Sequence, residues 1–151
     1  MTECSSQGVD PRAPRFNQAV TALTLLAAFL LGLPVLLAAP ALWLGAAAFL
    51  GPRWNLWGQA WVRLVRPALG LAPPTKLKVP GPPRFAAGLG FVFLVPATVL
   101  ALAGGTAALV GWSLALAVAA LAALAAITDY CLGCEIHAGL VRLRALAVRS
   151  P

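Results

Sequence analysis

A long stretch without a charged residue runs from Phe16 to Leu50, and two further apolar stretches follow at 85–103 and 107–130. The hydrocarbon core of a bilayer is about 30 Å thick, so a helix needs about 20 apolar residues to cross it. The segment from Phe16 to Leu37 is long enough for one crossing, and a second helix is predicted from about Ala38. We therefore expect an all-α integral membrane protein with four transmembrane helices.

The composition agrees with this fold class. Hydrophobic residues make up 61% of the chain and charged residues 10%, with a mean hydropathy of +0.89. A soluble domain is nearer half apolar and a quarter charged. The net charge of +7 is compatible with nucleic acid, but the aromatic and basic pattern of a nucleic-acid-binding module is missing. The expected partner is the lipid bilayer rather than nucleic acid.

The segment after the second helix is amphipathic. Tryptophan beside arginine is typical of the membrane–water interface. We expect the second helix to bend at Pro52 and to continue along the surface to about Arg66. A separate interfacial helix is the alternative. Apolar residues at helical spacing form one face and polar residues the other, namely Trp54, Trp57, Ala60, Trp61, Leu64 and Val65 against Asn55, Gln59, Arg63 and Arg66.

The chain contains an internal repeat. Residues 11–16 read P-R-A-P-R-F and residues 80–85 read P-G-P-P-R-F, an offset of 69 positions. Each half is then a helical hairpin entered through a Pro-Arg-Phe motif, and the two hairpins are parallel repeats related by an axis along the membrane normal. The same offset pairs Leu25 with Leu94, Trp43 with Trp112, and Trp61 with Tyr130.

The basic residues predict the orientation. All eleven Lys and Arg residues lie before the first helix, between Arg53 and Arg84, or after the fourth helix. The positive-inside rule assigns that side to the cytoplasm. We expect a multi-pass inner-membrane protein with both termini cytoplasmic. Its predicted segments are a cytoplasmic tail 1–15 that contains Cys4, a first hairpin with amphipathic extension 16–66, a cytoplasmic linker 67–84, a second hairpin 85–130, and a cytoplasmic CxxC segment with a basic tail 131–151.

The candidate chemistry lies in the stretch 131–137, which reads C-L-G-C-E-I-H. In a reducing compartment a C-x-x-C pair is more often redox-active or metal-binding than a structural disulfide. If the fourth helix continues through the stretch, Cys131, Cys134 and Glu135 share one face. The C-terminal end of a helix opposes thiolate formation, unless Gly133 breaks the helix and places Cys134 at a new N-terminus. We predict these three residues as the catalytic group.

Two alternatives stay open for the cysteines. The first is a metal site formed by Cys131, Cys134 and His137, whose ligand types suit zinc or iron. A second C-x-x-C is absent, so dimerisation would be needed to complete such a site, and we predict no metal or cofactor. The second alternative is that both cysteines only pack between helices. The sequence leaves the oligomeric state open, a homo-oligomer included.

Arg15 and Arg84 stand at the starts of the first and third helices on the same face of the membrane. Helix N-termini with arginines form an anion site, and we predict such a site close to the thiols. The alternative is that both arginines anchor the topology and the entry of each helix.

The two P-x-x-P-R-F motifs and the C-L-G-C-E sequence at 131–135 resemble a family of small bacterial membrane proteins catalogued as domain of unknown function forty-three ninety-five (DUF4395). The resemblance runs from about Asp10 to Arg144. It implies a four-helix membrane protein without a settled activity, associated with thioredoxin-like or sulfurtransferase partners. Members often carry asparagine shortly before the first cysteine, where this chain has Thr128 and Asp129.

These observations predict thiol-redox or sulfur-transfer chemistry at the cytoplasmic face through Cys131 and Cys134. The alternative function is that of a non-catalytic membrane subunit or anchor, which docks a soluble thioredoxin-like or sulfurtransferase partner. Transport of a small anion would require more polar groups in the spans than the four hydroxyl side chains available there, namely Thr21, Thr24, Thr98 and Ser113.

Overall fold

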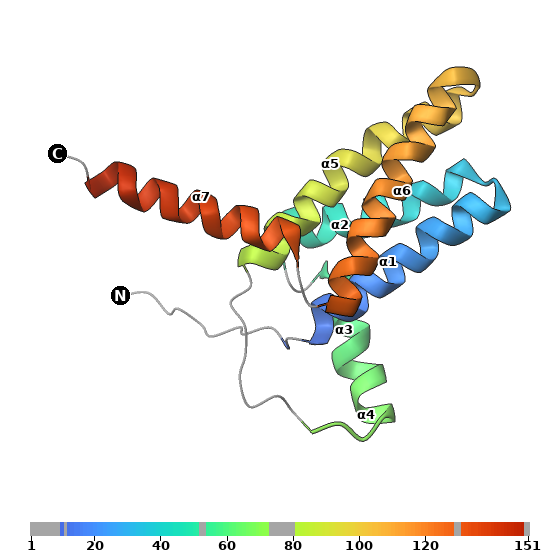
Figure 1. The fold of residues 1–151 in the computed structure, drawn as a ribbon. Coiled ribbons are helices and arrows are strands. Elements are labelled where there is room, and N and C mark those ends of the chain that lie inside the picture. Colours follow the sequence, from blue (N-terminus) through green and yellow to red (C-terminus); the bar gives the residue numbers. More distant parts are fainter. Residues whose placement is uncertain (1–9, 11, 52–53, 73–80, 129–130, 150–151) are drawn as a thin grey trace.

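The structure is a computed structural model that describes residues 10, 12–51, 54–72, 81–128 and 131–149 (Figure 1). The regular elements in these residues are all helical. Cys4, the predicted bend at Pro52, and Asp129 lie outside them. The elements are α1 (Arg12–Leu31), η1 (Pro34–Leu37), α2 (Ala38–Phe49), α3 (Leu56–Ala60), the π-helical turn η3 (Trp61–Val65), α4 (Arg66–Ala68), α5 (Gly81–Ala103), α6 (Gly105–Thr128) and α7 (Leu132–Arg149).

Helix α1 is shorter at its C-terminal end than predicted. Gly32 adopts a φ of 64°, and the N–H of Leu33 donates to the carbonyl of Ala28 at 3.0 Å. This left-handed glycine with a back-bonded successor is a Schellman type of helix end. The short 3₁₀ helix η1 then connects α1 to α2. The first hairpin therefore turns at Gly32 and not near Leu37.

Among the residues that the structure describes, two helices are long and apolar enough to cross a membrane by length and composition. They are residues Pro83–Ala103 of α5 and Gly105–Thr128, the whole of α6. The apolar segment Pro34–Phe49 is shorter. Helix α5 continues through Pro96.

Helices α1, α2, α5 and α6 pack across the repeat, and the two helices of the first hairpin contact each other little. Helix α1 packs against α6 and α2 packs against α5, whereas α1 and α2 contact each other little. The repeat relates α1 to α5 and α2 to α6, so these two contacts are equivalent. Leu25 and Leu94, which the offset pairs, are 1% and 0% exposed and lie in the same core. The packing supports the predicted duplication.

Helices α5 and α6 also pack closely against each other. A Cβ atom on Gly111 would lie 2.5 Å from the backbone nitrogen of Ala101 and 2.6 Å from the carbonyl oxygen of Ala97. A glycine is required for helices to approach this closely. The offset places Leu42 at the equivalent position of α2, where its side chain is 72% exposed. The second hairpin is therefore closed by a glycine contact and the first is not.

The amphipathic segment is a separate helix, so the predicted continuation of the second helix is wrong, and the interfacial location of the separate helix stays a prediction. Helix α2 ends at Phe49, and Gly51 adopts a φ of 95°. The side chain of Asn55 then caps α3 by accepting from the N–H of Gly58 at 3.0 Å. In Figure 1 both helix-to-helix connections of the hairpins lie at one end of the bundle, and α3–α4 and α7 leave from the other end.

Candidate functional site

The cysteine pair lies at the start of α7. The carbonyl oxygen of Cys131 accepts from the N–H of Cys134 at 3.0 Å and from the N–H of Glu135 at 3.1 Å. Cys131 is thus the N-cap residue, and Cys134 is the third residue of the helix. Since α6 ends at Thr128, the fourth helix does not continue through the pair. The new helix begins before Gly133 and not at it.

This position reverses the electrostatic argument drawn from the sequence. The N-terminus of a helix carries a partial positive charge and unpaired N–H groups, and an N-cap side chain is placed to accept from them. Such a site favours the thiolate form of a cysteine. Cys131 and Cys134 are both half-buried thiols. The helix dipole therefore supports thiolate formation at Cys131.

The turn also suits a disulfide. A hydrogen bond from residue i+3 to residue i closes a turn whose end Cα atoms lie within about 7 Å. Disulfide-bonded residues have Cα atoms about 4.4–6.8 Å apart. The bond from Cys134 to Cys131 closes a turn of this kind. The Cα atoms of the pair therefore lie about as close together as a disulfide requires.

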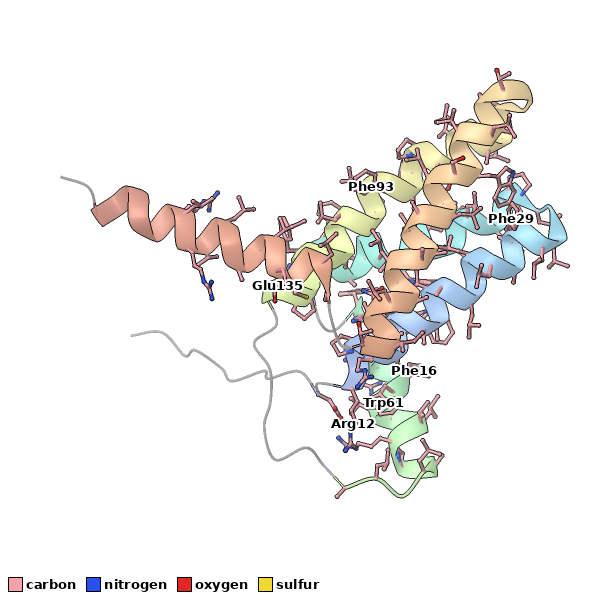
Figure 2. All side chains as sticks on the ribbon, viewed as in Figure 1. Arg12, Phe16, Phe29, Trp61, Phe93 and Glu135 are labelled. Carbon is pink, nitrogen blue, oxygen red and sulfur yellow. The ribbon has the colours of Figure 1, made fainter. Side chains whose placement is uncertain are left out.

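Two contacts hold this end of α7 against α5. A Cβ atom on Gly133 would lie 2.8 Å from the Cβ and 2.9 Å from the Cα of Ala86, so a side chain there would displace the helix. The ring of His137 packs on that of Phe85, with centroids 5.4 Å apart and planes at 55°. Glu135 is exposed beside the junction (Figure 2). Its predicted catalytic role stays a prediction.

The metal alternative gains no support from the geometry. Among the residues that the structure describes, no group of three or more His, Cys, Asp or Glu side chains is arranged to hold a metal ion. His137 lies against Phe85, on the side of α7 that faces α5. The three candidate ligands Cys131, Cys134 and His137 are not brought together.

Arg15 and Arg84 both bind the C-terminal end of a helix from the other half. Arg15 donates through Nε and Nη2 to the carbonyl of Ala126 at 3.2 and 3.1 Å, and through Nη2 to that of Ile127 at 3.1 Å. Arg84 donates through Nε and Nη2 to the carbonyl of Ala48 at 3.4 and 3.1 Å. A cation at these carbonyls is favourable. The bonds give the anchoring alternative a physical basis, and the anion site stays a prediction.

The phenylalanine of each motif holds the helix that follows its own hairpin. Phe16 packs on Trp57 and Trp61, with ring centroids 6.3 and 5.4 Å apart. Phe85 packs on His137 of α7. The P-R-F motif thus performs two equivalent tasks in each half. Its arginine binds a helix of the other half, and its phenylalanine packs on the helix that follows its own hairpin.

Asp10, which the sequence places in the cytoplasmic tail 1–15, is buried and bonded to other parts of the chain. It is 5% exposed, and its Oδ1 accepts from the N–H of Arg12 at 2.9 Å. Its Oδ2 accepts from Nε1 of Trp61 at 3.3 Å and lies 4.0 Å from Nη1 of Arg66. Asp before Pro at a helix start is an N-cap signature that could have revealed it. Asp10 ties α1 to the segment α3–α4.

The sequence matches the family DUF4395, described as a domain of unknown function, over residues 9–142. No curated protein and no solved structure matches the chain.

Proposed function

The chain belongs to the DUF4395 family, and we propose that it is a multi-pass inner-membrane protein with a reactive cysteine pair at the cytoplasmic face. Helices α1, α5 and α6 and the shorter apolar segment Pro34–Phe49, which comprises η1 and α2, are the four spans. The length and apolarity of α5 and α6 support this, as does the packing of α1 and α2 against them. Arg15 and Arg84 lie at the end from which α3–α4 and α7 leave, and the positive-inside rule assigns that end to the cytoplasm.

We propose that Cys131 and Cys134 carry out thiol–disulfide exchange. The observation that carries the proposal is the position of Cys131 as the N-cap of α7. The Cys131 thiolate attacks one sulfur of a partner disulfide and forms a mixed disulfide, and the partner's other sulfur leaves as a thiolate. The Cys134 thiolate then attacks Sγ of Cys131. The partner departs as a dithiol, and the pair of α7 is oxidised to a disulfide.

The partner is a soluble thioredoxin-like protein or sulfurtransferase that approaches from the cytoplasm. Sulfur relay begins with the same nucleophile, since a Cys131 thiolate that attacks the outer sulfur of a partner persulfide becomes a persulfide itself, and the partner's inner sulfur leaves as a thiolate. The exposed carboxylate of Glu135 lies directly after Cys134. We propose that this carboxylate accepts the proton of the resolving thiol, that of Cys134.

Single substitutions test the assignment of the two thiols. In a Cys4→Ser background, Cys134→Ser is expected to accumulate a mixed disulfide with a model disulfide such as oxidised glutathione, because the resolving thiol is lost. Cys131→Ser is expected to accumulate far less. Intact-mass spectrometry of the purified protein measures both. Equal adducts on the two variants would contradict the assignment.

A complementation experiment distinguishes the chemistry from the docking alternative. A deletion strain with a thiol-stress phenotype is supplied with either the native chain or the Cys131→Ser/Cys134→Ser variant. Thiol chemistry predicts rescue by the native chain alone. Full rescue by the double variant would leave the non-catalytic membrane subunit as the function.

A further inference from the structure

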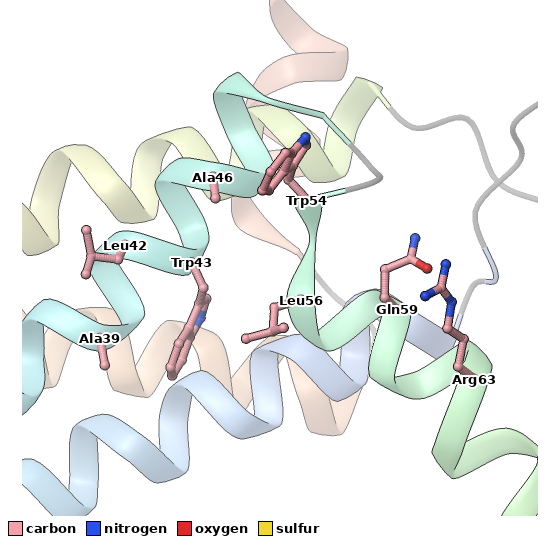
Figure 3. Close-up of a pocket in the computed structure, with 8 residues that line it drawn as sticks. All are labelled: Ala39, Leu42, Trp43, Ala46, Trp54, Leu56, Gln59 and Arg63. Atoms are coloured by element: carbon pink, nitrogen blue, oxygen red, sulfur yellow. The ribbon is translucent and has the colours of Figure 1, made fainter.

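A cavity of about 550 Å³ lies between α2 and the segment from Trp54 into η3 (Figure 3). Its volume is within the range of small-molecule sites, about 300–1,000 Å³. It lies outside the cysteine site and outside the contacts of the P-R-F motifs. Its lining consists of Ala39, Leu42, Trp43, Ala46, Trp54, Leu56, Gln59 and Arg63.

The cavity occupies a place that is filled in the other half of the molecule. The repeat offset relates Leu42 and Ala46 of α2 to Gly111 and Ala115 of α6. Both α6 residues are buried, and Gly111 packs on the backbone of α5. On α2 the same face is uncovered, because Leu42 is 72% exposed and Ala46 is only half-buried. Helix α1 does not cover this face as α5 covers its counterpart.

Trp43 reaches across the space that separates α2 from α1. Its Nε1 donates to Oγ1 of Thr21 on α1 at 3.3 Å, and its ring packs edge-on against Trp57 with centroids 5.6 Å apart. The indole thus forms a fixed wall of the cavity. Because the repeat places Trp112 at the equivalent position of α6, the difference between the two hairpins lies at Leu42 and Gly111, and Trp43 bridges α1 and α2 through its hydrogen bond to Thr21.

The cavity is apolar at one end and basic at the other. Ala39 and Ala46 are seven positions apart, which is about 10 Å along a helix, and they define an apolar floor on α2. Gln59 and Arg63 line the opposite end, on α3 and η3 (Figure 3). This polarity fits an amphiphile that has a hydrocarbon chain and an acidic head.

We propose that the cavity binds an anionic phospholipid of the cytoplasmic leaflet. The proposal rests on the membrane embedding proposed above. An acyl chain covers the open face of α2 at Leu42 and Ala46. At the equivalent position of α6, Gly111 is covered by α5. The phosphate lies at Arg63, whose planar guanidinium suits bidentate binding of phosphate oxygens. The cytoplasmic leaflet is the one that carries anionic lipids.

Tryptophan fluorescence tests the proposal, because Trp43 and Trp54 line the cavity. The purified chain is placed in nanodiscs of neutral phosphatidylcholine that contain a minor fraction of chain-brominated lipid, which quenches tryptophan on contact. The brominated lipid is either phosphatidylglycerol or phosphatidylcholine. We expect at least twofold stronger quenching by the anionic lipid. Arg63→Gln is expected to remove this preference, and Ala46→Phe to reduce quenching by filling the cavity.

Arg144→Gln is the matched control, since it removes one exposed arginine from α7, away from the cavity. It is expected to keep the preference. Equal quenching by the two brominated lipids, or a preference that survives Arg63→Gln, would overturn the lipid site and leave the membrane embedding intact. If neither of the two brominated lipids quenches any tryptophan, the membrane embedding itself is contradicted. Thermal unfolding of each variant confirms that it is folded.

Discussion

The two halves of the molecule begin with the same P-R-F motif, and the motif makes the same pair of contacts in each. Arg15 binds the end of α6 and Arg84 binds the end of α2, so each arginine reaches into the opposite half. Phe16 packs on Trp61 of η3, and Phe85 packs on His137 of α7, so each phenylalanine contacts the helix that follows its own hairpin. The duplicated motif therefore joins the two halves to each other at one end of the bundle.

The halves differ in how the hairpin closes and in what the surface helix carries. Gly111 closes the second hairpin, whereas Leu42 is exposed at the equivalent position of the first. In the first half, the segment α3–α4 is bound to the buried Asp10 through Trp61. In the second half, α7 begins with the cysteine pair. A shared scaffold thus carries an apolar cavity in one half and a dithiol in the other.

Substitutions at the paired positions 42 and 111 test this difference most severely. Gly111→Leu forces a side chain into the backbone of α5, and overpacking of this kind costs about 1–3 kcal/mol or more. Leu42→Ala removes an exposed side chain and is expected to cost under about 0.5 kcal/mol. Thermal unfolding in detergent measures both. Comparable losses for the two variants would mean that the hairpins close in the same way.

The contact of α7 with α5 offers a second, more local test. Gly133→Leu is expected to lift the start of α7 from Ala86 and to expose both cysteines. Their alkylation by iodoacetamide should then accelerate several-fold, at a cost of about 1–3 kcal/mol. Gly139→Leu is the control on the same helix, because nothing lies within 4 Å of a Cβ atom there. Unchanged alkylation in Gly133→Leu would show that this contact does not position the pair.

The sequence predicts the repeat because the motif and its offset can be read directly from the residues. Leu25 and Leu94 share an offset, a helical phase and a place in the core. It also places the positive charges at one end. It leaves open whether the fourth helix continues through the cysteines or a new helix starts there, and only the hydrogen bonds of Cys131 reveal the new N-terminus.

The partners of the arginines could not be predicted for a different reason. Ala48 and Ala126 bind through main-chain oxygens, so their side chains carry no signal of the contact. Asp10 is the opposite case, since Asp before Pro does carry a signal for a helix start. Its bonds to Trp61 and Arg66 depend on how α3–α4 returns to α1, and this return follows from no local pattern.

The two arginines give the smallest and most discriminating test of the equivalence of the halves. A hydrogen bond to a charged group contributes about 1.5–3 kcal/mol when buried, but both arginines are exposed, which reduces this strongly. Arg15→Gln removes three bonds to two carbonyls and is expected to cost about 1 kcal/mol. Arg84→Gln removes two bonds to one carbonyl and is expected to cost about half as much.

Arg15→Lys and Arg84→Lys separate the charge of these residues from their geometry. Lysine keeps the cation at the helix end but lacks the fork that reaches two acceptors. At Arg15, where the fork bridges Ala126 and Ile127, lysine should recover only part of the loss in thermal midpoint. At Arg84, with the single acceptor Ala48, it should recover most of it. Equal recovery at both positions would show that the arginines act through charge alone, and that the motif anchors the two halves by electrostatics rather than by a fitted contact.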